Sequence, residues 1–136
     1  MHDFKEARIK TIAMPKDTNA SGNIFGGWIM SQIDLAGAVV AHDLNIGRLV
    51  TVAVHSMEFK KAIQIGDIVN CYGKIIHVGK TSIRVQVEVY AKRLFETTHE
   101  HLHAASATLT YVQVNAKGEK MPILYTQDEL LALGIK

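Results

Sequence analysis

The feature that most constrains the fold is an apolar stretch at residues 26–41, GGWIMSQIDLAGAVVA, whose hydrophobic side chains recur at helical spacing. They form two adjoining stripes, the first with Ile29, Ile33, Ala36 and Val40 and the second with Met30, Gly37, Ala38 and Ala41. Gly26 and Gly27 open the stretch, and His42, Asn45 and Gly47 end it. The spacing predicts a helix of about 16 residues, or about 25 Å, that is buried on nearly all sides.

Asp34 lies in the middle of this predicted helix, between Ile33 and Leu35. A carboxylate among apolar side chains costs several kcal/mol unless hydrogen bonds or a wet cleft compensate, because desolvation disfavours its charged form. Two interpretations stay open on this residue alone. Asp34 is either a structural carboxylate satisfied by nearby donors or a general base or nucleophile tuned by its surroundings.

The glycine pair favours the catalytic interpretation. A helix N-terminus presents unpaired N–H groups and a positive dipole end, and glycines let a ligand approach that backbone closely, as an oxyanion hole requires. Gly27 and Asp34 are separated by about 10.5 Å of helical rise, so one helix cannot bring both groups to a single reacting atom. If both take part in catalysis, two chains build the site, and we expect a dimer with its helices side by side.

Strand patterns surround the helix at residues 8–14, 49–59, 68–78, 82–91 and 103–114, with short links that indicate antiparallel pairing. The run at 82–91 alternates most clearly, with Ile83, Val85, Val87 and Val89 predicted to point inward and Arg84, Gln86, Glu88 and Tyr90 outward. The run at 49–59 predicts a buried strand with Val50, Val52 and Val54 on one face and Ala53, His55, Met57 and Phe59 on the other.

These elements predict one domain over residues 1–136, of the α+β class, with an antiparallel sheet wrapped around a long central helix. Its core spans about residues 8–115. A capping box at Thr126 and Glu129 predicts a short helix at about residues 126–133, which we assign to packing or oligomer contacts.

The pattern in residues 18–34, TNASGNIFGGWIMSQID, resembles the signature of hotdog-fold acyl-CoA thioesterases, in particular the YciA-type bacterial group related to vertebrate cytosolic acyl-CoA hydrolases. The segments VAVHSMEFKKAIQIGDIV and VGKTSIRVQVEVYAK resemble the same group. The resemblance covers about residues 8–115. It implies the hotdog fold, hydrolysis of acyl-CoA to free fatty acid and coenzyme A, and a hexamer made of three dimers.

The resemblance also implies roles for individual residues. Asp34 would be the general base or nucleophile, and the Gly27 N–H would form the oxyanion hole, helped by Asn19 or Asn23. Both asparagines are equally well explained as turn residues, and the resemblance points mainly to Asn19. Possible walls for the acyl chain are Met30, Met57 and Phe59. Candidate substrate contacts are Gly26, Lys60, Lys61, Lys80, Thr81, Ser82 and Arg84, although basic residues at strand ends are often only a solvated rim.

Composition excludes several other classes of partner. A net charge of +2 is too small for nucleic acid as the main partner, no apolar run is long enough to span a membrane, and the charged start predicts a cytoplasmic protein. Cys71 has no partner for an internal disulfide, and its place in an apolar run predicts a buried small hydrophobe. His99, His101 and His103 alternate, but apart from Glu96 and Glu100 no carboxylate or thiol accompanies them at ligand spacing, so we expect no metal site. No cofactor is expected, since coenzyme A would enter and leave as part of substrate and product.

Two rival functions stay open. A hotdog dehydratase for hydroxyacyl thioesters would pair a histidine with a carboxylate, whereas this chain has Phe25 where many hotdog thioesterases carry a histidine before the glycine pair. A non-catalytic acyl-CoA-binding module would retain ligand binding without turnover. The presence of Asp34 favours hydrolysis over both.

Overall fold

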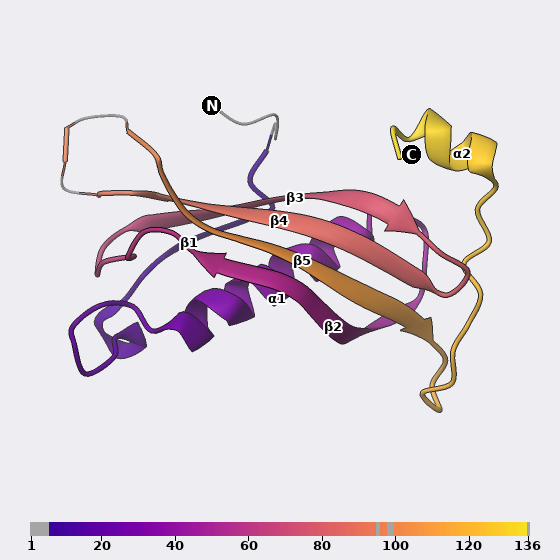
Figure 1. Ribbon diagram of the computed structural model, residues 1–136, viewed down its shortest axis with the longest axis horizontal. Helices are drawn as coiled ribbons and strands as arrows, with labels where there is room; N and C mark the ends of the chain where they lie inside the picture. The colour runs from indigo at the N-terminus through magenta and orange to yellow at the C-terminus, as the bar shows by residue number, and fades with distance from the viewer. Residues whose placement is uncertain (1–5, 95, 98–99, 136) are drawn as a thin grey trace.

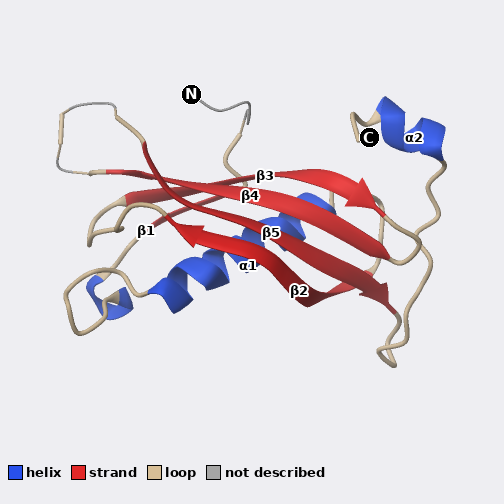
Figure 2. Ribbon diagram, in the orientation of Figure 1, coloured by secondary structure: helices blue, strands red, loops and turns tan. Residues whose placement is uncertain are grey.

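A five-stranded antiparallel sheet curves around one long helix in the computed structural model, which describes residues 6–94, 96–97 and 100–135 (Figures 1 and 2). The elements in chain order are β1 (Ile9–Ile12), the 3₁₀ turn η1 (Pro15–Asp17), α1 (Gly26–Ala41), β2 (Arg48–Phe59), β3 (Ile68–Val78), β4 (Ser82–Lys92), β5 (Leu102–Val114) and α2 (Gln127–Ala132). The strand order in the sheet is β1-β3-β4-β5-β2. The predicted α+β architecture, with a sheet wrapped around a helix, is confirmed.

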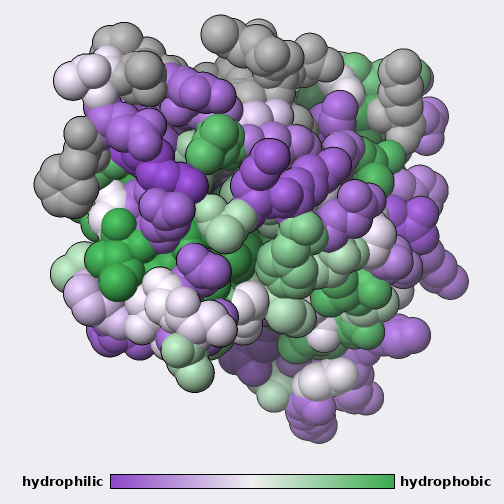
Figure 3. Space-filling view, turned by 60° about the vertical axis from the view of Figure 1, so that its left-hand side comes forward, coloured by the Kyte–Doolittle hydropathy of each residue, from purple (hydrophilic) through white to green (hydrophobic). Residues whose placement is uncertain are grey.

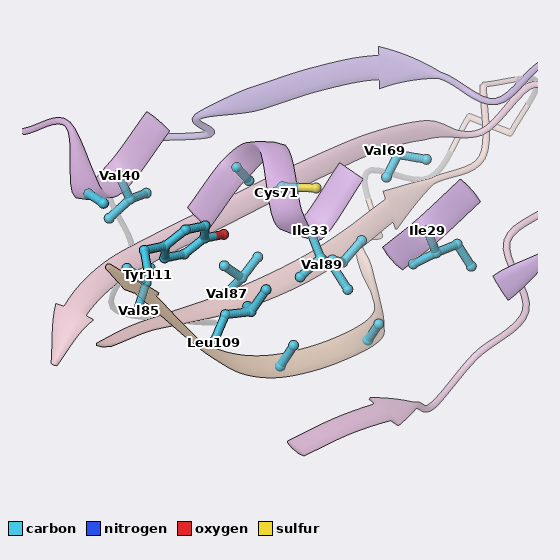
Figure 4. Close-up of a cluster of buried hydrophobic side chains, with 14 of the residues drawn as sticks. Ile29, Ile33, Val40, Val69, Cys71, Val85, Val87, Val89, Leu109 and Tyr111 are labelled. Atoms are coloured by element: carbon cyan, nitrogen blue, oxygen red, sulfur yellow. The ribbon is translucent and has the colours of Figure 1, made fainter. Parts of the chain in front are cut away.

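The core lies between α1 and the concave face of the sheet. Ile83, Val85, Val87 and Val89 of β4 are fully buried, as the alternation predicted. They meet the buried stripe of α1, and Figure 4 shows Ile29, Ile33 and Val40 of the helix facing the valines of β4. Cys71 of β3 is fully buried in the same layer, as predicted. Since β4 is the central strand, each of its inward side chains is covered by the helix and by both neighbouring strands.

The outward face of β4 differs in one respect from the prediction. Glu88 is buried although it belongs to the outward set, because it accepts hydrogen bonds from His103 (2.7 Å), from the Ser106 hydroxyl (2.5 Å) and from the Gln86 amide (3.0 Å). Tyr90 stacks on the ring of His103 with a centroid distance of 4.6 Å. Alternation predicts which way a side chain points, but not which outward side chains cover one another.

Strand β2 departs further from the prediction of a buried strand. It is an edge strand, and Val50, Val52 and Val54 are 42%, 54% and 47% exposed in the single chain. Its pairing with β5 shifts register twice, after Thr51 and again after Val54. Each shift inserts one residue into the strand and resets the alternation, so the predicted division of β2 into two faces is wrong.

Helix α1 also differs from the prediction of burial on nearly all sides. Its buried residues are Ile29, Ile33, Ala36, Gly37, Val40 and Ala41, which form one face. Met30, Leu35 and Val39 are exposed in the single chain. Of these, Met30 lies near Val54 of the edge strand β2, so exposed apolar side chains of both elements meet where the sheet ends.

Arg8, close to the start of the described residues, and Leu130 of α2 both pack against this central unit. Arg8 forms a bidentate ion pair with Asp43 (2.6 and 2.7 Å), which ties the residue before β1 to the end of α1. The predicted capping box at Thr126 and Glu129 starts α2, as expected. No helix within the described ranges is long and apolar enough to cross a membrane, and the predicted cytoplasmic location stays a prediction.

Candidate active site

The Asp34 carboxylate is half-buried and held by two hydroxyl groups that come from neighbouring strands. The Thr51 hydroxyl of β2 donates to Oδ1 at 2.7 Å. The Tyr111 hydroxyl of β5 lies 2.7 Å from the Asp34 carbonyl oxygen and 3.1 Å from Oδ1. Thr51 and Tyr111 are directly paired across the two strands. Both residues therefore reach the same carboxylate oxygen from beneath the helix.

Tyr111 remains a donor under all ordinary conditions. Burial, and then the neighbouring Asp34 carboxylate, raise the pKa of the Tyr111 phenol far above its usual range. A protonated hydroxyl next to a carboxylate donates rather than accepts its hydrogen bond. Tyr111 therefore stays un-ionised and keeps its proton for a hydrogen bond to Asp34.

A small cavity of about 220 Å³ opens beside the carboxylate. Its walls combine apolar side chains with the polar groups of the helix and of β2, namely Met30, Ser31, Asp34, Thr51, Val54, Met57 and Leu109. Val54 and Met57 share this cavity because of the register shifts in β2, although the alternation placed them on opposite faces. Of the predicted acyl-chain walls, Met30 and Met57 lie here beside Asp34, whereas Phe59 does not.

The start of α1 forms a second cavity, of about 330 Å³, lined by Asn19, Asn23, Ile24, Gly26, Ile29, Phe59, Lys60, Lys61, Ala62 and Ile63. Six of these residues were predicted as site residues from two separate segments of the sequence, namely Asn19, Asn23, Gly26, Phe59, Lys60 and Lys61. Within the described ranges, the N–H groups of Gly26 and Gly27 have no hydrogen-bond partner, and no side chain caps the helix. The molecular surface at this end mixes hydrophobic with hydrophilic side chains (Figure 3).

Asn19 organises the loop that leads into the helix. Its side-chain oxygen accepts hydrogen bonds from the backbone N–H of Ser21 (2.9 Å) and of Asn23 (3.2 Å). Its backbone N–H donates to the Asn23 carbonyl oxygen at 2.7 Å. The turn role is therefore present, and the Asn19 side-chain NH₂ remains as a donor at the wall of the cavity.

The remaining predicted contacts lie elsewhere in the chain. Lys80 and Thr81 lie in the turn between β3 and β4, and Ser82 begins β4, where it pairs with Val112 of β5. Phe59, next to the lysine pair, pairs with Ala105. The two positions are about 23 Å apart along β5, at opposite ends of the sheet (Figure 1). One chain does not bring Lys80, Thr81, Ser82 and Arg84 together with the cavity at the start of α1.

Histidines and metal-ligating groups contribute little to these cavities. His55 lies 2.5 Å from the Thr110 hydroxyl, on the opposite face of the sheet from Asp34. The described parts of the chain contain no group of three or more side chains suited to hold a metal ion. His99, one of the three histidines considered for metal binding, lies outside the described residues.

Sequence reasoning missed Thr51 and Tyr111. A hydroxyl within the apolar run LVTVAV and a tyrosine at an inward position of β5 were the available signals. Neither identifies its partner, because the partner lies 17 residues away for Thr51 and 77 residues away for Tyr111.

Comparison with known proteins places this site in a family. Residues 21–94 match the thioesterase superfamily. The chain belongs to the thioesterase superfamily. The match includes the start of α1, Asp34 and Thr51, and most residues that line the two cavities lie within it, whereas Asn19 and Leu109 lie outside it.

Similar superfamily members are known at the level of structure and of sequence. The chain is 47% identical to a hexameric hotdog fold thioesterase of Campylobacter jejuni, with a TM-score of 0.87 over 97% of this chain and 98% of that one. It is 42% identical to a hexameric broad-specificity acyl-coenzyme A thioesterase, with a TM-score of 0.86 over 98% and 90% of the two chains. It is 42% identical to the acyl-CoA thioester hydrolase YciA of Escherichia coli over 82% of this chain and 85% of that protein. These similarities confirm the hotdog fold and the family resemblance.

Proposed function

We propose that this protein hydrolyses acyl-CoA to a free fatty acid and coenzyme A. The observation that carries the proposal is the Asp34 carboxylate, which two hydroxyl groups hold at the wall of a largely apolar cavity. Relatives named acyl-CoA thioester hydrolases support the choice of substrate class. A fixed carboxylate beside an apolar cavity suits a general base that activates water against an acyl thioester.

The unpaired N–H of Gly27 would donate a hydrogen bond to the thioester oxygen as negative charge develops on it, and the Asn19 or Asn23 side chain would assist. Asp34 would remove a proton from water as its oxygen attacks the thioester carbon. The tetrahedral intermediate would then expel coenzyme A as a thiolate, which takes up the proton. The alternative mechanism at the same site is direct attack of Asp34 on the thioester carbon, which would give a mixed anhydride that water then hydrolyses.

The proposal requires two chains at each site. The start of α1 and Asp34 line separate cavities in one chain, in agreement with the helical rise of about 10.5 Å between Gly27 and Asp34. The exposed apolar side chains of α1 and β2 offer the surface on which a second copy would bring its own Asp34 to the first copy's Gly27. The hexameric state of similar thioesterases supports a further step to three such dimers.

Coenzyme A would bind through basic and small polar side chains. Lys60 and Lys61 stand at the cavity that also contains Gly26 and Phe59. Lys80, Thr81, Ser82 and Arg84 lie at the far end of the sheet, so they would contact the phosphates only from another subunit. Coenzyme A is in this scheme part of substrate and product, and no separate cofactor takes part.

The two rival functions are less well supported. A dehydratase of this fold would be expected to pair a histidine with the carboxylate, whereas His55 lies on the other face of the sheet, beside Thr110. A pure binding module has no need for an aspartate held by two hydroxyl groups. A dehydratase would consume a hydroxyacyl thioester without releasing thiol. A binding module would bind acyl-CoA but would neither consume it nor release thiol.

The deciding experiment measures thiol release from short-chain to long-chain acyl-CoA substrates, for the wild type and for Asp34→Asn. We expect the wild type to turn over at least one substrate, and the variant to lose at least about 100-fold in kcat while it still binds coenzyme A and keeps its melting temperature. Asp128→Asn, in the exposed first turn of α2, is the matched control. Equal activity of wild type and Asp34→Asn would show that Asp34 is structural, and a lack of thiol release by both would refute hydrolysis.

A further inference from the structure

Tyr111 makes an unusual contact for a core tyrosine. Its ring is buried in the layer between β5 and α1, and Figure 4 shows its hydroxyl directed from the strand toward the helix. There the hydroxyl lies within hydrogen-bond distance of two oxygens of Asp34, its backbone carbonyl oxygen and its carboxylate Oδ1. One side chain thus contacts both the backbone and the reactive group of the proposed catalytic residue.

Gly37 makes this contact possible. It lies three residues after Asp34, on the same face of α1. A Cβ atom at position 37 would overlap the hydroxyl and ring of Tyr111. The missing side chain leaves a notch in the helix surface at Gly37, and this notch carries a cost in stability because glycine is less favourable than alanine in the middle of a helix. In this structure the notch gives the Tyr111 hydroxyl its access to Asp34.

The two hydroxyl groups divide the carboxylate into a held oxygen and a free one. Thr51 and Tyr111 both approach Oδ1, whereas Oδ2 has no hydrogen bond from any residue that the structure describes. Thr51 belongs to the edge strand β2, and Tyr111 to the interior strand β5. Tyr111 therefore fixes the turn of α1 that carries the carboxylate from within the rigid part of the sheet.

We infer that Tyr111, admitted by the notch at Gly37, is a positioning residue that holds Asp34 so that its free oxygen Oδ2 faces the cavity where water attacks the thioester. The inference rests on the proposed catalytic role of Asp34. Tyr111 touches neither substrate nor water in this scheme. It acts only through the orientation of Asp34, so its loss lowers kcat and leaves the binding of acyl-CoA unchanged.

The test uses the 136-residue chain and begins with Tyr111→Phe, which removes the hydroxyl and keeps the ring. We expect kcat for acyl-CoA hydrolysis to fall about 10- to 100-fold, with KM within about twofold of the wild type. The matched control is Tyr125→Phe, which removes a hydroxyl that accepts a hydrogen bond from the Asn45 backbone N–H at 2.8 Å, far from Asp34. Tyr125→Phe should retain the wild-type kcat.

A double-mutant cycle separates positioning from a general loss of packing. In the Asp34→Asn background there is no carboxylate to position, so Tyr111→Phe should lower the residual kcat by less than about twofold. An equal loss of kcat in both backgrounds would overturn the inference and make Tyr111 merely structural. A wild-type kcat for Tyr111→Phe would overturn it as well.

A second variant covers the case in which Tyr111→Phe folds poorly. Gly37→Ala keeps the tyrosine but displaces its hydroxyl, and we expect the same fall in kcat at an unchanged KM. Wild-type kcat in Gly37→Ala would contradict the inference. Failure of the proposed function is recognised separately, because in that case Asp34→Asn itself would retain full activity.

Discussion

The two edges of the sheet are built in opposite ways. β1 spans only Ile9–Ile12, contains Lys10, and is tied to α1 through the Arg8–Asp43 ion pair. β2 spans Arg48–Phe59 and exposes a row of valines together with Phe59. Short, charged edge strands resist pairing with other chains, whereas long apolar ones invite it. The comparison indicates that β1 closes the sheet, while β2 is the edge that the proposed dimer would use.

A charge placed on β2 should give the largest effect. Val52→Asp puts a carboxylate in the middle of the proposed contact, where it would be desolvated without a partner. We expect the assembly to dissociate and thiol release to fall at least about 100-fold, because each site needs two chains. Light scattering after size-exclusion chromatography measures the mass, and Ile12→Asp on β1 is the matched control with unchanged mass. A Val52→Asp protein with wild-type mass and activity would contradict the assignment of β2.

A milder change compares β2 with the central strand. Val87→Ala in β4 removes two buried methyl groups and should lower the free energy of unfolding by about 2 kcal/mol, with kcat retained. If a second copy covers β2, Val52→Ala should cost about 1 kcal/mol in the assembled protein. Denaturant titration at high protein concentration measures both values. A cost of zero for Val52→Ala would mean that water, not protein, covers this edge.

The smallest effect concerns the closed edge. The hydrogen bonds from Arg8 hold the pKa of Asp43 below its usual range, although burial acts in the opposite direction. A carboxyl group whose pKa is lower in the folded than in the unfolded state stabilises the protein at any pH above its unfolded-state pKa of about 4. That stabilisation is lost as the pH falls through the lower, folded-state pKa. Asp43→Asn should therefore cost less than about 1 kcal/mol at pH 7, since the pair is solvent-screened, and the cost should shrink as the pH falls below about 4.

Urea titrations of wild type and Asp43→Asn at pH 7, 4 and 3 measure this convergence. Asp128→Asn, which removes an exposed carboxylate of α2, controls for the general effect of net charge. A difference between wild type and Asp43→Asn that grew toward low pH would show that the ion pair does not hold β1 in place.

The sequence predicts the local features of the fold well. Helix α1 was found from its periodicity and its glycine start, because both depend on neighbouring residues in the chain. The inward set of β4, from Ile83 to Val89, was also correct, since a central strand without interruption within that segment keeps strict alternation. The capping box of α2 is a local pattern of the same kind.

Features that depend on distant partners could not be predicted in the same way. The composition of β2 resembles that of β4, but its position at the sheet edge and its two register shifts follow from pairing with β5. Asp34 was identified because a mid-helix carboxylate is costly. Its partners Thr51 and Tyr111 were not, since nothing in the local pattern connects them to the helix. The roles of Asn19, Gly27 and the basic residues stay predictions.

The burial of Cys71 has a practical consequence for the measurement of coenzyme A release. Burial raises the pKa of this thiol, the only one in the chain, to about 12. At pH 8 about one molecule in ten thousand would carry the reactive thiolate. A disulfide reagent added to the folded enzyme therefore reports the product alone. A slow reaction of one further equivalent of the reagent would come from Cys71 and would show that the protein is unfolding.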